Sequence, residues 1–94
     1  MALEFEWDAA KADANFAKHG VSFGEASTVF QDSLSVTVSD PRHSRSEERF
    51  AILGRSADGR LLAVFHTDVD DRVRIISARP ATRRERATYE EELR

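Results

Sequence analysis

Four short segments in the second half of the chain have the residue pattern of strands, and they constrain the fold more than any other feature. In the first segment Leu34, Val36 and Val38 alternate with serine and threonine, which is typical of a strand with one buried face. The later segments are separated by short turns, among them Asp58-Gly59, a pair that favours a tight hairpin. The segments 34–39, 48–55, 61–67 and 72–79 therefore predict an antiparallel meander.

A strand and a helix are expected before this meander. Residues 3–7 alternate apolar and acidic side chains, which predicts a short strand at a sheet edge. Asp8 can cap a helix that runs through Lys18, and Gly20 can adopt the left-handed conformation that ends it. Because aromatic residues are usually buried, Trp7 is expected in the core.

Two further helices are predicted from serine or threonine followed three residues later by glutamate, the spacing of a capping box. The first pair, Ser22 and Glu25, starts a helix to about Phe30, and the second, Thr82 and Glu85, starts one to about residue 93. Residues 1–94 are thus expected to form a single α+β domain, in the order β-α-α-β-β-β-β-α. Its helices should pack on one face of a mostly antiparallel sheet.

The charge of the chain is unevenly distributed. The net charge of -3 alone argues against a nucleic-acid partner, because phosphate binding requires cationic side chains. Between Arg72 and Ala87, however, six arginines accompany a single acid, Glu85. Arginine outnumbers lysine twelve to two, and its planar guanidinium can hold a phosphate through two hydrogen bonds at once. We interpret region 72–87 as a phosphate-binding surface, with ordinary solvated arginines as the alternative.

Several classes of chemistry lack the residues they need. The chain has no cysteine, which excludes disulfides and thiolate chemistry and fits a reducing cytoplasm, where we expect the protein to act. It begins with neither a signal-like segment nor an apolar run long enough to span a membrane. The three histidines, His19, His43 and His66, are scattered, so we expect no metal and no other cofactor. No serine lies in a nucleophile elbow.

A histidine and several arginines are sufficient to cleave RNA, because RNA supplies its own nucleophile in the 2′-hydroxyl. His66 can exchange a proton near neutral pH, although an inert, packed histidine at a strand end is the alternative interpretation. Arg72 and Arg74 share one face of the last strand, whereas Arg74 and Arg79 would point to opposite faces if that strand were regular. Tyr89 is expected to anchor the last helix, with its hydroxyl as a second possible phosphate contact.

The string Arg-Ile-Ile-Ser-Ala-Arg at 74–79 is the most specific of several motifs in the chain. Together these motifs, which cover roughly residues 5–91, resemble the BrnT family of toxins. The other similar motifs are Phe5-Glu6-Trp7-Asp8 with Lys11, Asn15, Lys18-His19-Gly20-Val21-Ser22-Phe23, Glu25-Ala26, Val29-Phe30, His43-Ser44, Glu48-Arg49, Gly54-Arg55-Ser56, His66-Thr67, Glu85-Arg86 and Tyr89. One departure is Asp68-Val69 after Thr67, where relatives often have an arginine.

The resemblance implies a RelE-like fold and a metal-independent endoribonuclease that inhibits translation. It also implies a BrnA-like antitoxin, which binds DNA through a ribbon-helix-helix domain and forms a two-to-two complex with the toxin. The resemblance places function on a histidine and several arginines of the sheet, which match His66, Arg49, Arg55, Arg74 and Arg79. Among these our own hypothesis makes His66, Arg74 and Arg79 catalytic, with His66 moving the proton and the two arginines stabilising the phosphate. The expected RNA-binding residues are Arg49, Arg55, Arg72, Arg83, Arg84 and Tyr89.

Two alternative functions that involve no enzymatic step remain open. Region 72–87 could bind RNA or DNA without cleaving it, which predicts strongly salt-dependent binding and an intact substrate. It could instead contact an acidic segment of a partner protein through paired hydrogen bonds.

Overall fold

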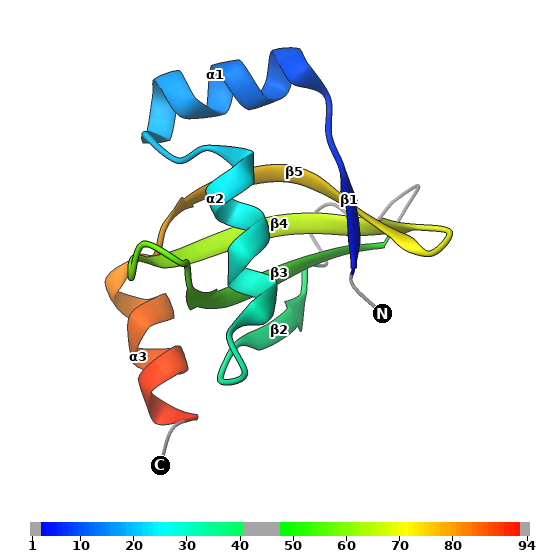
Figure 1. The fold of residues 1–94 in the computed structure, drawn as a ribbon. Helices are drawn as coiled ribbons and strands as arrows, with labels where there is room; N and C mark the ends of the chain where they lie inside the picture. Colours follow the sequence, from blue (N-terminus) through cyan, green and yellow to red (C-terminus); the bar gives the residue numbers. More distant parts are fainter. Residues whose placement is uncertain (1–2, 41–47, 93–94) are drawn as a thin grey trace.

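A computed structural model describes residues 3–40 and 48–92, arranged as a sheet with helices around it (Figure 1). The loop predicted around Pro41 and His43 lies outside these described residues. The elements are β1 (Glu4–Glu6), α1 (Ala9–His19), α2 (Phe23–Thr28), a 3-10 turn η1 (Val29–Gln31), β2 (Val36–Ser39), β3 (Arg49–Arg55), β4 (Leu61–Val69), β5 (Arg72–Pro80) and α3 (Arg83–Glu91). Their order confirms the α+β class and the predicted succession of strands and helices.

The five strands form one sheet in the order β1-β5-β4-β3-β2. Strands β2 to β5 pair antiparallel as neighbours, which confirms the meander, and β1 adds a parallel edge beside β5. The turn between β4 and β5 is tighter than expected, because β4 continues to Val69 and Asp70 takes a positive φ of 56°. The first and last strands of the chain, β1 and β5, are therefore neighbours in the sheet.

One face of the sheet carries the apolar core. Ile52, Val64 and Ala78 lie opposite one another on β3, β4 and β5, and all three belong to the buried cluster. The other buried members of this cluster are Val21, Phe23, Ala26, Val29, Leu62 and Ile75. Figure 1 shows α2 crossing in front of the strands on this side. We call this surface the helix-covered face.

Side chains from the opposite face reach α3. Because side chains alternate along a strand, Arg55 and Arg79 point away from the helix-covered face. The guanidinium of Arg55 lies 6.0 Å from the ring centroid of Tyr89 in α3, and Arg79 pairs with Glu85 in the same helix. Helices α1 and α2 thus share one face of the sheet, while α3 is tied to the other.

Strand β5 contains a bulge that changes the expected direction of its side chains. Phe65 pairs with Ser77 but His66 pairs with Ile75, so Ile76 is an extra residue without a partner in β4. An extra residue shifts the alternation by one position. Arg74 and Arg79, five residues apart, therefore lie on the same face rather than on opposite faces, as a regular strand would have required.

The predicted core role of Trp7 is wrong, because this side chain is 41% exposed. Phe16 is also exposed, and the buried residue of α1 is instead Asn15. The Asn15 amide accepts from the backbone N–H of Ala78 at 3.1 Å and donates to the carbonyls of Ala78 and Val21 at 2.8 and 3.0 Å. Asn15 therefore fixes α1 to β5 by hydrogen bonds, beside the packing of Ala12 against the core.

Only one of the two capping boxes forms completely. Thr82 and Glu85 exchange both hydrogen bonds at the start of α3. Ser22 accepts from the backbone N–H of Glu25 at 3.0 Å, but the Glu25 carboxylate binds Arg60 at 2.6 Å instead of returning to the cap. An arginine within reach outcompetes a backbone donor, because a hydrogen bond between two charged groups is the stronger one.

Candidate RNA-binding site

Arginines from two strands, β3 and β5, share the face opposite the helix-covered face. Arg49, Thr67 and Arg74 lie side by side on β3, β4 and β5, and Arg72 and Arg79 lie on the same side of β5. On β4, Thr67 pairs with Arg74 and Ala63 pairs with Arg79. These two β4 positions are four residues apart in sequence, which corresponds to about 13 Å along the strand. We call Arg49, Arg72, Arg74 and Arg79 the arginine face.

Glu6 of β1 neutralises part of this face. Its carboxylate accepts from Nε and Nη2 of Arg74, both at 2.7 Å, and lies 3.3 Å from Nε of Arg72. The arginine side chains are almost half exposed, at 46% for Arg74 and 47% for Arg72. Ion pairs this exposed contribute little to stability, so an incoming anion can exchange with Glu6 at low cost.

Arg79 is held more firmly than the other arginines of the face. Its two terminal nitrogens donate to the two carboxylate oxygens of Glu85 at 2.7 and 3.0 Å, and its guanidinium lies 5.2 Å from the ring centroid of Phe65. The hydrogen bond to Glu85 raises the pKa of Arg79. Burial alone would raise the pKa of Glu85, but the hydrogen bonds from Arg79 and Thr82 outweigh it and lower that pKa. The pair stays charged and fixes the guanidinium over Phe65.

The other predicted RNA-binding residues lie around α3. Arg83 and Arg84 are exposed in its first turn, and Arg55 donates to the carbonyl of Gly59 at 3.2 Å. Tyr89 is 3% exposed, and its hydroxyl donates to Asp32 at 2.7 Å. Burial, together with this hydrogen bond, raises the pKa of Tyr89. Its hydroxyl is therefore committed to anchoring α3, as expected for its structural role, and is not directed toward the arginine face.

His66 does not lie with the arginines. The alternation of β4 places it on the helix-covered face, where it is 6% exposed and its ring centroid lies 4.9 Å from that of Phe30 and 5.6 Å from that of Phe50. Neither ring nitrogen has a hydrogen-bond partner among the described residues. Burial lowers the pKa of His66, against a smaller opposing effect of Asp68. This placement corresponds to the packed-histidine interpretation, so the structure does not bring His66 together with Arg74 and Arg79.

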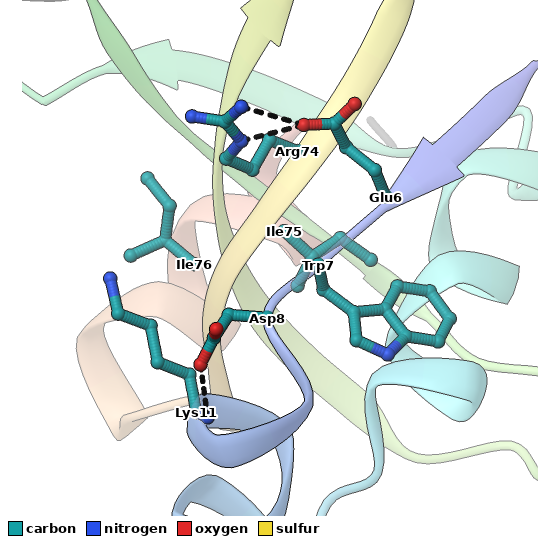
Figure 2. A pocket seen from close by; sticks show the side chains of 7 residues that line it. All are labelled: Glu6, Trp7, Asp8, Lys11, Arg74, Ile75 and Ile76. Carbon is teal, nitrogen blue, oxygen red and sulfur yellow. Dashed lines mark hydrogen bonds and ion pairs between the residues drawn. The ribbon is translucent and has the colours of Figure 1, made fainter.

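A pocket of about 430 Å3 opens beside Arg74, where β1, β5 and the start of α1 meet. It is lined by Glu6, Trp7, Asp8, Lys11, Arg74, Ile75 and Ile76. Figure 2 shows the Lys11 ammonium and the Arg74 guanidinium on the same side of β5, with Ile76 between them in this view. The indole of Trp7 extends on the other side of the strand.

Other kinds of site are not found in the described part of the chain. Residues 3–40 and 48–92 contain no group of three or more histidine, aspartate or glutamate side chains placed to hold a metal ion. Within the same ranges, no helix combines the length and the apolar character needed to cross a bilayer.

Comparison with known proteins identifies the class to which this fold and this basic face belong. Residues 7–85 match the family model described as "Ribonuclease toxin, BrnT, of type II toxin-antitoxin system". Because this match covers most of the chain, the protein belongs to the BrnT family.

A solved structure supports the same fold. The crystal structure of the Brucella abortus ribonuclease toxin BrnT matches with a TM-score of 0.63 and 22% sequence identity, covering 87% of this chain and 100% of the Brucella chain. No curated protein matches the chain in sequence.

Sequence reasoning missed three residues that the structure places at this site: Glu6, Lys11 and Phe65. Glu6 and Lys11 were named only as parts of a family motif, without a role, yet both line the pocket beside Arg74. Phe65 was assigned no role, yet it lies under Arg79 on the arginine face. Their approach depends on the parallel pairing of β1 with β5, which has no local sequence signature, and on the bulge, whose one local sign is the changed phase of the apolar positions in β5.

Proposed function

We propose that this protein is an endoribonuclease that cleaves RNA without a metal ion and thereby inhibits translation. Membership in a family described as ribonuclease toxins supports this proposal. The observation that carries it is the arginine face, where the bulge at Ile76 aligns Arg74 and Arg79 on the same side of β5. Guanidinium groups fixed on rigid strands can hold successive phosphates and stabilise the negative charge that develops during cleavage.

The proposed reaction uses the nucleophile of the substrate. The 2′-oxygen attacks the adjacent phosphorus, the bond from phosphorus to the 5′-oxygen breaks, and the products carry a 2′,3′-cyclic phosphate and a 5′-hydroxyl. The proton lost by the 2′-hydroxyl balances the one gained by the 5′-oxygen. The arginine face provides charge stabilisation for this step, and Phe65 offers an aromatic surface against which a base can stack.

We further propose a protein partner and a place of action. An antitoxin of the BrnA type, with a ribbon-helix-helix domain that binds DNA, would cover the arginine face in a two-to-two complex. A type II toxin–antitoxin family implies such a partner, and an acidic surface would complement the exposed arginines. The substrate and the lack of cysteine agree with action in the cytoplasm.

The direct test is incubation of the purified protein with a single-stranded RNA in the presence of EDTA. We expect cleavage with 2′,3′-cyclic phosphate ends, and no cleavage at a position that carries a single 2′-deoxy substitution. Cleavage that requires added metal would contradict the metal-independent reaction, and cleavage at the 2′-deoxy position would contradict the role of the 2′-hydroxyl.

A second candidate is a nucleic-acid-binding module without catalysis. It is favoured by the position of His66, which leaves the described part of the arginine face without an imidazole. This candidate predicts that RNA is bound in a strongly salt-dependent manner and recovered intact.

A further inference from the structure

The pocket beside Arg74 contains a lysine whose role the fold does not explain. The backbone N–H of Lys11 donates to the capping carboxylate of Asp8 at 2.9 Å, which fixes this residue in the first turn of α1. Its side chain is exposed, and its ammonium has no ion-pair partner among the described residues. Figure 2 shows this ammonium extending along β5 toward the side on which Arg74 lies.

The charges around the pocket leave room for one anion. Two cations, Lys11 and Arg74, line the pocket together with two carboxylates, those of Glu6 and Asp8. The Asp8 carboxylate is occupied with capping α1, and that of Glu6 is shared between Arg72 and Arg74. Neither carboxylate pairs with the Lys11 ammonium, so a phosphodiester that displaces Glu6 from Arg74 meets two cations there.

The pocket is continuous with the arginine face, because Arg74 belongs to both. An RNA strand that runs along β5 from Arg79 toward Arg72 therefore passes the mouth of the pocket. Ile76 lines the same space between Lys11 and Arg74 and provides an apolar wall. Electrostatic contacts are strengthened where such walls keep water away from the charged groups.

We propose that this pocket holds the phosphodiester that is cleaved, and that Lys11 and Arg74 together contact its non-bridging oxygens. This inference rests on the proposed ribonuclease function and assigns the reacting phosphate to one place on the arginine face. The phosphate takes the position of Glu6 at Arg74, while Lys11 approaches from α1. Lys11 is then a catalytic residue, since its ammonium stabilises the charge that develops on those oxygens.

Two lysines of α1 allow a matched test. Lys11→Gln and Lys18→Gln each remove one positive charge from the same helix, and Lys18 is exposed in the last turn, away from the pocket lining. We expect Lys11→Gln to lower kcat for single-stranded RNA at least about tenfold and Lys18→Gln to change it less than about twofold. Lys11→Arg, which keeps the charge, should recover most of the rate. Equal effects of the two glutamine variants would overturn the proposal.

A binding measurement decides the question even if no cleavage occurs. Fluorescence anisotropy of an end-labelled RNA reports binding without a probe in the protein. In a titration with an RNA uniformly 2′-O-methylated to prevent cleavage, we expect Lys11→Gln to raise Kd at least about threefold relative to Lys18→Gln. A wild-type protein without cleavage activity would refute the proposed function, whereas unchanged Kd in Lys11→Gln would refute this pocket.

Discussion

The two faces of the sheet are built from the same strands but differ in chemistry. On the helix-covered face, Leu62, Val64 and Ile75 are buried beneath α1, α2 and η1. On the other face the same strands present Arg49, Arg74 and the other members of the arginine face. Helices that cover one side of a small sheet thus provide the core, and the opposite side is left to carry charge.

His66 shows what this difference means for function. An imidazole is useful for proton transfer only where it can meet a substrate, and His66 is packed between Phe30 and Phe50 instead. Arg72 and Arg74, in contrast, are partly exposed and paired with Glu6, which an anion can replace. Residue type alone would assign the chemistry to both faces, whereas burial leaves His66 inaccessible and the arginine face open to a substrate.

The largest expected effect is loss of cleavage when the arginine face is altered. Arg74→Gln removes a cation from both the face and the pocket, and should slow cleavage of single-stranded RNA about 100-fold. Initial rates measured with Lys18→Gln as the control separate this loss from a change in overall charge. A rate within twofold of wild type would show that the arginine face is not where RNA is cleaved.

A smaller effect is expected in the helix-covered face. His66→Leu replaces an unpartnered buried imidazole with an apolar side chain, and should raise the free energy of unfolding by about 1 kcal/mol at pH 7. Cleavage should remain within about twofold of wild type. Chemical denaturation measures the free energy of unfolding, and initial rates measure cleavage. Loss of cleavage without loss of stability would show that His66 takes part in the reaction.

The same residue should make stability depend on pH. Since burial lowers its pKa, folded His66 remains neutral at a pH where the unfolded chain already binds a proton. Its contribution to stability is therefore complete above the unfolded pKa, about 6.5, and is lost as the pH falls toward the folded pKa, by up to about 1.4 kcal/mol per pH unit. Urea unfolding at pH 7.5, 6.5 and 5.5 should show this loss in wild type, and His66→Leu should lack it. The same dependence of the free energy of unfolding on pH in both proteins would contradict this role of His66.

The smallest effect concerns the competition between Glu6 and RNA for Arg72 and Arg74. Glu6→Gln removes the carboxylate that pairs with Arg72 and Arg74, and should tighten binding of a 2′-O-methylated RNA about threefold. Fluorescence titration at constant salt measures the change. Weaker binding would mean that Glu6 orients the two arginines instead of competing with RNA.

Most of the fold follows from local patterns in the sequence. Alternation of apolar residues identifies the strands, Asp58-Gly59 identifies a hairpin, and Thr82 marks the start of the last helix. These signals are local because strand alternation, turn geometry and capping each involve only a few neighbouring residues. The exposure of Trp7 did not follow, because it depends on what packs against β1 and α1 in three dimensions.

The candidate site was harder to predict because it depends on which face each residue occupies. The phase of the apolar positions in β5 changes between Ile75 and Ala78, and this change is the one local sign of the bulge. His66 continues the buried series of Leu62 and Val64, but both faces of β4 are largely apolar, so its burial could not be distinguished from exposure. The approach of Lys11 to Arg74 requires long-range pairing between β1 and β5.

The most direct test of the difference between the two faces is an NMR titration of the 15N-labelled protein with a 2′-O-methylated single-stranded RNA. We expect the largest amide shifts along Arg72–Arg79 and at Lys11, with little change in Val21–Val29 on the helix-covered face. The largest shifts in Val21–Val29, with β5 unaffected, would contradict the assignment of RNA binding to the arginine face.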